Sequence, residues 1–378
     1  MRKKINIGLI VVLCLLLSLG FAGQAFASWL DGEYEEMDEL DEGGFFALHD
    51  MDSGEELERM NRVCFEDDEI ILSDNRRYRI HHIEDGEYKA HCEQIMDYEA
   101  PVLAMSVMEQ TDLAAGEEKT VAIYATHSDE SYVPTSGTES QEGGGDILDV
   151  AATIAASLEE QGVTVLHSDN IHDPHDSDAY DRSRETAADL LKSGNVAMII
   201  DVHRDGVPDP EFYENEVDGE QITQIRLVVG ASNENSEENE AFAEQLKAYF
   251  DEVKPGLIKS IYIAKGEYNQ DLAPNSILLE VGTHTNTLEE AEAGAEMFAQ
   301  ELPGFLKLGN AAGGNANENN DENAGQNASS STDEDNMTDN TQAQADNSRS
   351  IWPIILVVVV VLAVGGAVYW FMKKDEIK

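Results

Sequence analysis

Three apolar segments of this sequence lead into side chains that could bind a metal ion. The first ends in His127-Ser128-Asp129-Glu130, the second ends in His203, and the third carries Glu280. A catalytic zinc ion typically takes three protein ligands from His and Asp or Glu, and it leaves its fourth position to water. We therefore predict a zinc ion bound by His127, Glu130 and His203. Glu280 would then be the general base that moves the proton of water.

Each of the other polar residues near these motifs could have a structural or a functional role. An unpaired carboxylate inside an apolar strand is costly, which favours a functional role for Glu280 over a structural one. Arg184 opens a helix and is a candidate catalytic residue, because it could hold a substrate carboxylate; pairing with a local acid is the alternative. His167, His172 and His175 lie among aspartates, which favours a solvated loop over a metal contact.

Strand and helix patterns alternate along the region 105–308, which we predict to be the catalytic domain. Apolar strands are expected over 121–126, 163–166, 196–202, 225–229, 260–264 and 276–281, and helices over 146–161, 180–192, 236–253 and 287–302. This alternation predicts an α/β fold with a mostly parallel twisted sheet and helices on both of its faces. In such sheets, functional residues collect at the carboxyl ends of the strands, so the three motifs should converge.

A small β module is expected before the catalytic domain, over residues 44–95. Short β-like segments at 45–48, 69–72, 78–80 and 88–90 are separated by Asp, Gly and Asn turn signals. Residues 96–118 are expected to be a connector. Cys64 and Cys92 could form a disulfide in an oxidising space, but two cysteines are weak evidence for or against a bond.

The N-terminal end has the pattern of a secretory signal peptide. Arg2-Lys3-Lys4 precedes an apolar run, and Ala25-Phe26-Ala27 offers small residues two positions apart. We therefore predict a signal peptide over 1–27, followed by an acidic disordered segment over 28–43.

The C-terminal end has the pattern of a membrane anchor. Residues 309–350 lack Leu, Ile, Val and aromatic side chains, and they are expected to form a disordered acidic linker. Residues 351–372 are apolar and long enough to cross a bilayer, and Lys373-Lys374 follows them. The positive-inside rule then gives a single-pass membrane protein with an extracellular catalytic domain and a cytoplasmic tail at 373–378.

The charge balance restricts the partners. The chain has 24 Lys plus Arg against 76 Asp plus Glu, so its formal net charge is −52. Such a chain does not neutralise phosphates, which excludes nucleic acid and basic adhesion to anionic lipids. Self-repulsion at this charge is tolerable when salt screens it, so we predict adaptation to high salt. An acid-rich calcium-binding surface is the alternative explanation.

Four motifs resemble those of the stage II sporulation protein P family. They cover about residues 105–305 in the same order: Tyr124-Ala125-Thr126-His127-Ser128-Asp129-Glu130-Ser131-Tyr132, Tyr180-Asp181-Arg182-Ser183-Arg184-Glu185-Thr186, Ile200-Asp201-Val202-His203-Arg204-Asp205 and Leu279-Glu280-Val281-Gly282. The small β module also resembles the N-terminal part of some members. The resemblance implies a zinc-dependent N-acetylmuramoyl-L-alanine amidase fold and activity, with some endopeptidase cleavage. It also implies peptidoglycan as substrate and is compatible with wall-lytic partner proteins.

By the same resemblance, His127 and His203 match metal-binding histidines and Glu280 matches the catalytic acid. The carboxylate ligand is then Glu130 or Glu142, and Glu130 is favoured because His-x-x-Glu is itself part of the motif. Two other functions remain open on the residues alone: a zinc carboxypeptidase-like peptidase, which would trim peptides, and a non-catalytic wall-binding protein.

Overall fold

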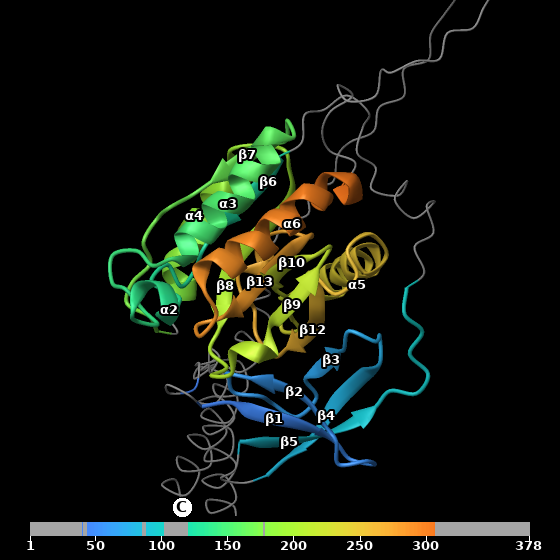
Figure 1. Ribbon diagram of the computed structural model, residues 1–378. Helices are drawn as coiled ribbons and strands as arrows, with labels where there is room; N and C mark the ends of the chain where they lie inside the picture. The colour runs from blue at the N-terminus through green and yellow to red at the C-terminus, as the bar shows by residue number, and fades with distance from the viewer. Residues whose placement is uncertain (1–39, 41–43, 85–87, 102–119, 177, 307–378) are drawn as a thin grey trace, which may run out of the picture. The chain divides into compact units, whose positions relative to one another are not determined.

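The computed structural model describes most of the predicted β module and of the predicted catalytic domain (Figure 1). It describes residues 40, 44–84, 88–101, 120–176 and 178–306. The predictions for the two ends lie outside these residues and stay predictions, apart from residue 40 of the acidic segment: 1–27, 28–43, 309–350, 351–372 and 373–378. In the part of the chain that the structure describes, no helix is long and apolar enough to span a membrane.

Strands and helices alternate after residue 120, as the sequence predicts. The elements are β6 (Thr120–Tyr124), α2 (Val133–Ser136), α3 (Ile147–Glu160), β7 (Thr164–His167), α4 (Ala179–Lys192), β8 (Val196–Asp205), η2 (Pro210–Phe212), β9 (Glu214–Val217), β10 (Glu220–Thr223), β11 (Ile225–Gly230), α5 (Ser236–Val253), β12 (Ile258–Ala264), η3 (Gln270–Leu272), β13 (Ser276–Thr283) and α6 (Leu288–Leu306). Each strand and helix predicted here is present, with ends shifted by a few residues at most.

The catalytic strands form a mostly parallel sheet, which confirms the predicted fold class. Their order is β12-β11-β13-β8-β6-β7, and every neighbouring pair is parallel except β11 and β13. Because β6, β8 and β13 run in the same direction, their carboxyl ends share one edge of the sheet. The three predicted motifs follow or occupy these three strands.

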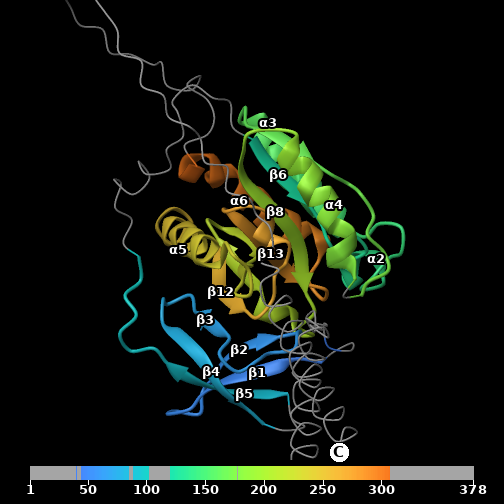
Figure 2. The same ribbon diagram turned by 180° about the vertical axis from the view of Figure 1, so that it is seen from behind.

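Helices cover both faces of this sheet (Figures 1 and 2). On one face, Ile200 and Val202 of β8 pack into a core that α3, α5 and α6 complete. On the other face, Ile199 of β8 packs with Tyr124 and with Ala187 of α4. Successive strand residues point to opposite faces, so Asp201 and His203 share the α4 face with Ile199.

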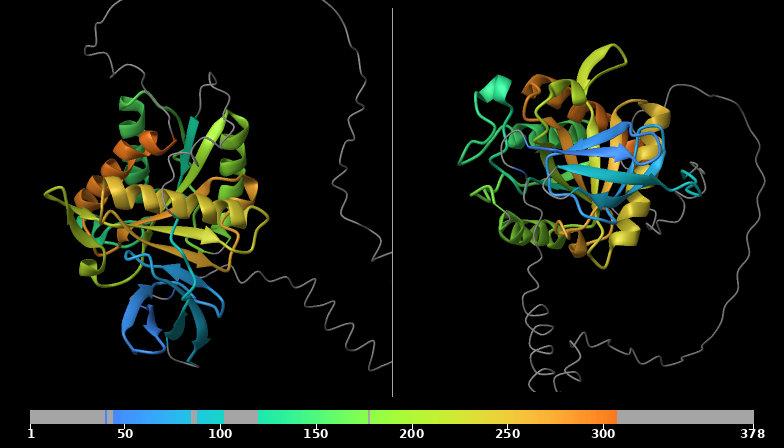
Figure 3. Two further views of the ribbon diagram at one scale, coloured as in Figure 1. Left: turned by 90° about the vertical axis from the view of Figure 1, so that its right-hand side faces the viewer. Right: turned by 90° about the horizontal axis from the view of Figure 1, so that it is seen from below.

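The N-terminal module continues the catalytic sheet (Figure 3). Its strands are β1 (Phe46–Asp50), β2 (Glu56–Met60), β3 (Glu69–Ile71), β4 (Arg77–Ile83) and β5 (Lys89–Gln94). Strand β3 pairs antiparallel with β12, so the module and catalytic strands form one sheet of eleven strands, and β9 and β10 form a separate sheet of two strands. The sequence predicts the module itself but not this junction, and it does not predict β2, whose residues are Glu-Leu-Glu-Arg-Met.

The module also buries the second face of three catalytic strands. Val228 of β11, Tyr262 of β12 and Leu278 of β13 pack into one core with module side chains such as Leu48 and Tyr78. Apolar strand faces need a cover to leave water, and here the module supplies it. Module and catalytic strands therefore share a hydrophobic core.

The two module cysteines are free thiols. Cys64 and Cys92 are both buried in this shared core and form no disulfide. Burial raises the pKa of the Cys92 thiol to about 12, which disfavours the reactive thiolate.

A buried ion network fastens the module to the catalytic strands. Arg226 of β11 pairs with Asp205 of β8 and, at 3.2 Å, with Glu58 of β2. It also donates a hydrogen bond of 3.0 Å to the carbonyl oxygen of Arg59. Its side chain is only 2% exposed, so these partners must replace the water that would otherwise stabilise its positive charge.

We expect Arg226→Ala to lower the free energy of unfolding by roughly 3–5 kcal/mol, because it leaves the buried Asp205 without its cation. Glu58 would keep only its longer contact with Lys259, at 3.5 Å. Urea denaturation of the purified protein measures this loss. Arg76→Ala is the matched control, since Arg76 pairs with Asp74 at the surface, where the side chains are 40% and 50% exposed. That variant should lose at most about 1 kcal/mol. Equal losses in both variants would contradict the role of the network.

Candidate active site

A tight loop after β6 carries His127 and Glu130. The backbone N–H of Ile147, at the start of α3, donates to the Glu130 carbonyl oxygen at 3.0 Å. Gly145 lies against the same carbonyl, and a Cβ atom there would come within 2.2 Å of it. Only glycine fits so close to a backbone, so the first turn of α3 fixes the position of Glu130.

The Glu130 carboxylate is the centre of the site. It is fully buried, and its Oε1 atom lies 3.3 Å from Nδ1 of His127 and 3.3 Å from Nδ1 of His203. Its Oε2 atom accepts a hydrogen bond of 2.9 Å from the backbone N–H of Arg204. Burial alone would raise the pKa of Glu130, but His203 and Arg204 hold it well below its usual value. The sequence-predicted group of His127, Glu130 and His203 is therefore brought together.

Asp201 contacts the ring nitrogen of His203 that is not directed at Glu130. The two residues are two positions apart on β8, and His203 Nε2 lies 3.1 Å from Asp201 Oδ1. Asp201 also accepts hydrogen bonds from the backbone N–H and the hydroxyl of Thr126, at 2.8 and 2.6 Å. Burial opposes protonation of His203, yet Asp201 and Glu130 raise its pKa well above the ordinary value. Asp201 thus ties β8 to the start of the loop that carries His127.

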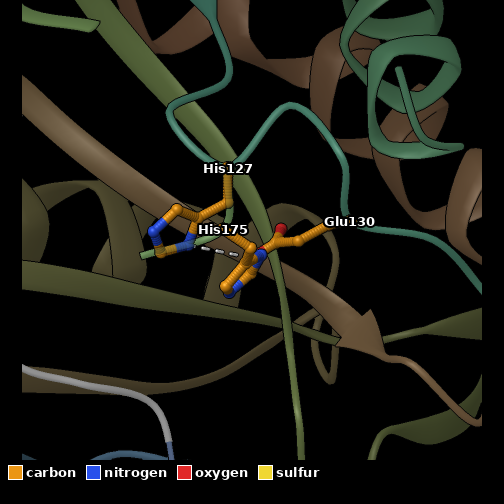
Figure 4. Close-up of side chains that lie close together, drawn as sticks. All are labelled: His127, Glu130 and His175. Atoms are coloured by element: carbon orange, nitrogen blue, oxygen red, sulfur yellow. Dashed lines mark ion pairs between the residues drawn. The ribbon is translucent and has the colours of Figure 1, made fainter. Parts of the chain in front are cut away.

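His175 joins this group, contrary to the prediction of a solvated loop. A ligand atom from each of His127, Glu130 and His175 lies within 4.8 Å of the others, and Figure 4 shows the three side chains converging. The ring centroids of His127 and His175 are 4.1 Å apart, and His175 Nδ1 lies 3.1 Å from Asp129 Oδ1. No local pattern signals these contacts, because they join segments 46 residues apart in the chain.

His172 also departs from the solvated-loop prediction. It is buried, and its two ring nitrogens lie 2.8 Å from the Ala125 carbonyl oxygen and 2.9 Å from the Thr186 hydroxyl. These contacts fasten the loop after β7 to β6 and α4. His172 therefore has a structural role, and it helps to hold the segment that carries His175.

Glu280 lies on the strand next to His203. The pairing of β13 with β8 sets Glu280 directly beside His203, so their side chains emerge on the same face. Glu280 is buried, and Arg62 Nη2 donates to its Oε1 atom at 3.0 Å. Burial raises the pKa of Glu280 to about 7, against the lowering effect of Arg62. A carboxyl group with a pKa near neutral suits general acid–base chemistry.

Two other predicted residues lie outside the group. Glu142, the alternative carboxylate ligand, is exposed in the turn before α3 and joins no cluster of ligands among the described residues. The hydrogen bonds and ion pairs of Arg184 all go, in the described part of the chain, to Asp271 and Asn269 near η3. The catalytic role of Arg184 therefore stays a prediction.

The cluster has the chemistry of a zinc site. Imidazole nitrogens and one carboxylate oxygen are the donors that catalytic zinc takes. Histidines that bind a metal usually donate their second ring N–H to a carboxylate. His175 has such a contact with Asp129, and an oxygen of Asp201 lies 3.1 Å from the second ring nitrogen of His203. The donor set and its supporting carboxylates fit a zinc ion.

Buried imidazoles around one carboxylate, at the shared edge of parallel strands, define an α/β protein with a candidate metal centre. The chain belongs to the Stage II sporulation protein P (SpoIIP) family, whose model matches residues 60–303. A relative named Stage II sporulation protein P, from Bacillus subtilis (strain 168), is 31% identical over 220 residues, which are 52% of this chain and 55% of the relative. The chain thus spans about half the length of this curated relative.

Solved structures of amidases are also similar to about half of the chain. The catalytic domain of CwlV, an N-acetylmuramoyl-L-alanine amidase from Bacillus (Paenibacillus) polymyxa var. colistinus, has 18% identity and a TM-score of 0.33, and 50% of this chain covers 99% of it. The CwlD amidase from Clostridioides difficile, in complex with the GerS lipoprotein, has 13% identity and a TM-score of 0.33, and 50% of this chain covers 98% of it. A likeness this weak does not bear on function.

His203 should give the metal-free protein a pH-dependent stability. Its pKa is raised in the folded state from the ordinary 6.5, so its stabilising contribution is complete below that value and is lost as pH rises through the folded pKa. The difference in free energy of unfolding between wild type and His203→Gln should therefore be largest near about pH 6 and shrink at higher pH. Urea denaturation in a chelating buffer measures it.

His167→Gln is the control for this experiment. Burial lowers the pKa of His167, so its contribution should change with pH in the opposite direction. A difference between wild type and His203→Gln that is independent of pH would contradict the contact of His203 with Asp201 and Glu130.

Proposed function

We propose that this protein is a zinc-dependent peptidoglycan hydrolase. It would cleave the amide between N-acetylmuramic acid and L-alanine of the stem peptide. The observation that carries the proposal is the Glu130 carboxylate, which lies 3.3 Å from a nitrogen of each of His127 and His203, with Glu280 on the neighbouring strand. Membership of the stage II sporulation protein P family supports the same reaction and a role in sporulation.

Some residues of the site would bind the metal ion, and Glu280 would transfer the proton. His127, Glu130 and His203 would hold the metal ion, as predicted from the sequence. Among the described residues, the group whose ligand atoms all lie within 4.8 Å of one another is His127, Glu130 and His175, so His175 is the alternative third ligand to His203. Zinc, when bound, supplies Lewis acidity toward the scissile carbonyl and lowers the pKa of water. Glu280 takes a proton from the attacking water and gives it to the leaving amine. Its Oε2 atom is suited to this step, because it has no hydrogen-bond partner among the described residues.

The proposed substrate agrees with the predicted location. A signal peptide at 1–27 and a membrane span at 351–372 would place the catalytic domain on the outer face of the cell membrane, where peptidoglycan lies. A linker over 309–350 would let the domain reach the wall. Wall-lytic partner proteins belong to the same proposal.

The purified protein should release intact stem peptides from cell-wall sacculi. The release should stop in a chelator and return with zinc, and His127→Ala should abolish it because one metal ligand is lost. Glu280→Gln should lower kcat by roughly 10²–10⁴-fold, since it removes the general base. Mass analysis of the soluble products measures both. His167→Ala is the matched control, and it should keep wild-type activity.

The products separate the alternatives. Free amino acids or shortened peptides would indicate a carboxypeptidase-like or endopeptidase reaction in place of the amidase reaction. Binding to sacculi without product, and without stoichiometric zinc, would indicate a wall-binding protein and would overturn the proposed hydrolysis.

Asp201→Asn should weaken zinc binding by roughly 10–100-fold, because the neutral amide makes His203 a poorer ligand. The amide oxygen can still accept from the backbone N–H of Thr126, whereas the amide NH2 replaces the oxygen that accepts from the Thr126 hydroxyl. Competition with a chromophoric chelator measures the affinity. Asp189→Asn, on the exposed face of α4, is the control and should bind zinc as wild type does. Equal affinities in the two variants would contradict the support of His203 by Asp201.

A further inference from the structure

Arg62 reaches from the N-terminal module into the candidate active site. It lies just after β2, and its Nη2 atom donates to Glu280 Oε1 at 3.0 Å. The two side chains are only 10% and 5% exposed. The Nη1 atom of Arg62 donates to the Tyr268 hydroxyl at 3.1 Å, and the guanidinium lies 5.5 Å from the centre of that ring. Arg62 is thus held from two directions.

The packing around Arg62 leaves its backbone little freedom. The neighbouring Asn61 donates its backbone N–H to Asp205 Oδ1 at 3.4 Å and its side-chain amide to the Gly44 carbonyl oxygen at 2.5 Å. A Cβ atom on Gly206 would lie 2.0 Å from the Asn61 side chain, so this contact requires glycine. The segment that carries Arg62 is therefore pressed against the end of β8.

The ion pair makes the two oxygens of Glu280 unequal. Oε1 is occupied by Arg62, whereas Oε2 is buried and has no hydrogen-bond partner among the described residues. Burial and the contact of Oε1 with Arg62 together restrict the orientation of the carboxylate, so Oε2 is the oxygen left to meet a substrate. Such positioning contributes to rate because little ordering remains to be done during the reaction.

We propose that Arg62 is a positioning residue for Glu280, so that the N-terminal module completes the active site. The inference rests on the proposed function, since it assigns Arg62 to the proton transfer by Glu280. It means that the region 105–308, predicted as the catalytic domain, carries the metal ligands but lacks one part of the machinery. The module is then more than a cover for the sheet.

The test compares Arg62→Gln, Arg62→Lys and Arg59→Gln in the full-length protein, loaded with zinc and assayed on sacculi. Arg62→Gln should lower kcat by roughly 10–100-fold with KM almost unchanged, because Glu280 loses its fixed orientation. Arg62→Lys keeps the charge and should recover part of the loss. Arg59 is the matched control, since its side chain pairs with Glu56 and Asp209 near the surface, and Arg59→Gln should act as wild type.

An unfolding measurement tests the pair independently of activity. Melting temperatures are compared for Arg62→Gln, Glu280→Gln and the double variant. Each single change leaves one buried partner unpaired, so the double variant should lose fewer degrees than the sum of the two single losses. Additive losses would overturn the pairing.

The outcomes separate this inference from the proposed function. A wild-type protein that hydrolyses nothing with zinc bound overturns the proposed function, and the role of Arg62 in it fails as well. Hydrolysis by wild type together with an unchanged kcat in Arg62→Gln overturns the inference alone. A loss of kcat in Arg62→Gln that Arg62→Lys partly restores, with normal Arg59→Gln, supports both.

Discussion

The structure depends on one buried charge, the carboxylate of Glu130. A carboxylate can leave water only when hydrogen bonds and opposite charges replace its hydration. Here the replacement comes from imidazoles of two segments and from the Arg204 backbone N–H. Satisfying this one group fixes the loop after β6 and the end of β8 relative to each other, and the first turn of α3 is tied to the same residue through the Glu130 backbone carbonyl. The geometry that would bind a metal ion follows from the same requirement, because the groups that stabilise the anion are themselves ligands.

Much of this arrangement could be predicted from the sequence. Apolar runs define the strands, and the helix expected over 236–253 has the same ends in the structure. The convergence of His127, His203 and Glu280 follows from a topological rule, since parallel strands bring their carboxyl ends to one edge. Long and strongly periodic segments can therefore be placed from the sequence alone. The pairing of Glu280 with His203 adds only the register between two neighbouring strands.

The features that the sequence did not predict depend on contacts between distant segments. His175 sits in a polar loop, and only the folding of that loop over β6 brings it to His127. Strand β2 has charged residues at three of its five positions, and its pairing with β1 makes it a strand. The hairpin of β9 and β10 is different, because Asp218-Gly219 at its turn is a recognisable signal; both residues have positive φ, 56° and 87°.

The junction of β3 with β12 has a consequence for how this protein can evolve. If the module were lost, β12 would become an open edge with unpaired backbone groups, which invites association with other chains. The apolar faces of β11, β12 and β13 would lose their cover at the same time. Recombination that transfers the second half of the gene alone should therefore yield an aggregating product, and the two halves should be inherited as a single unit.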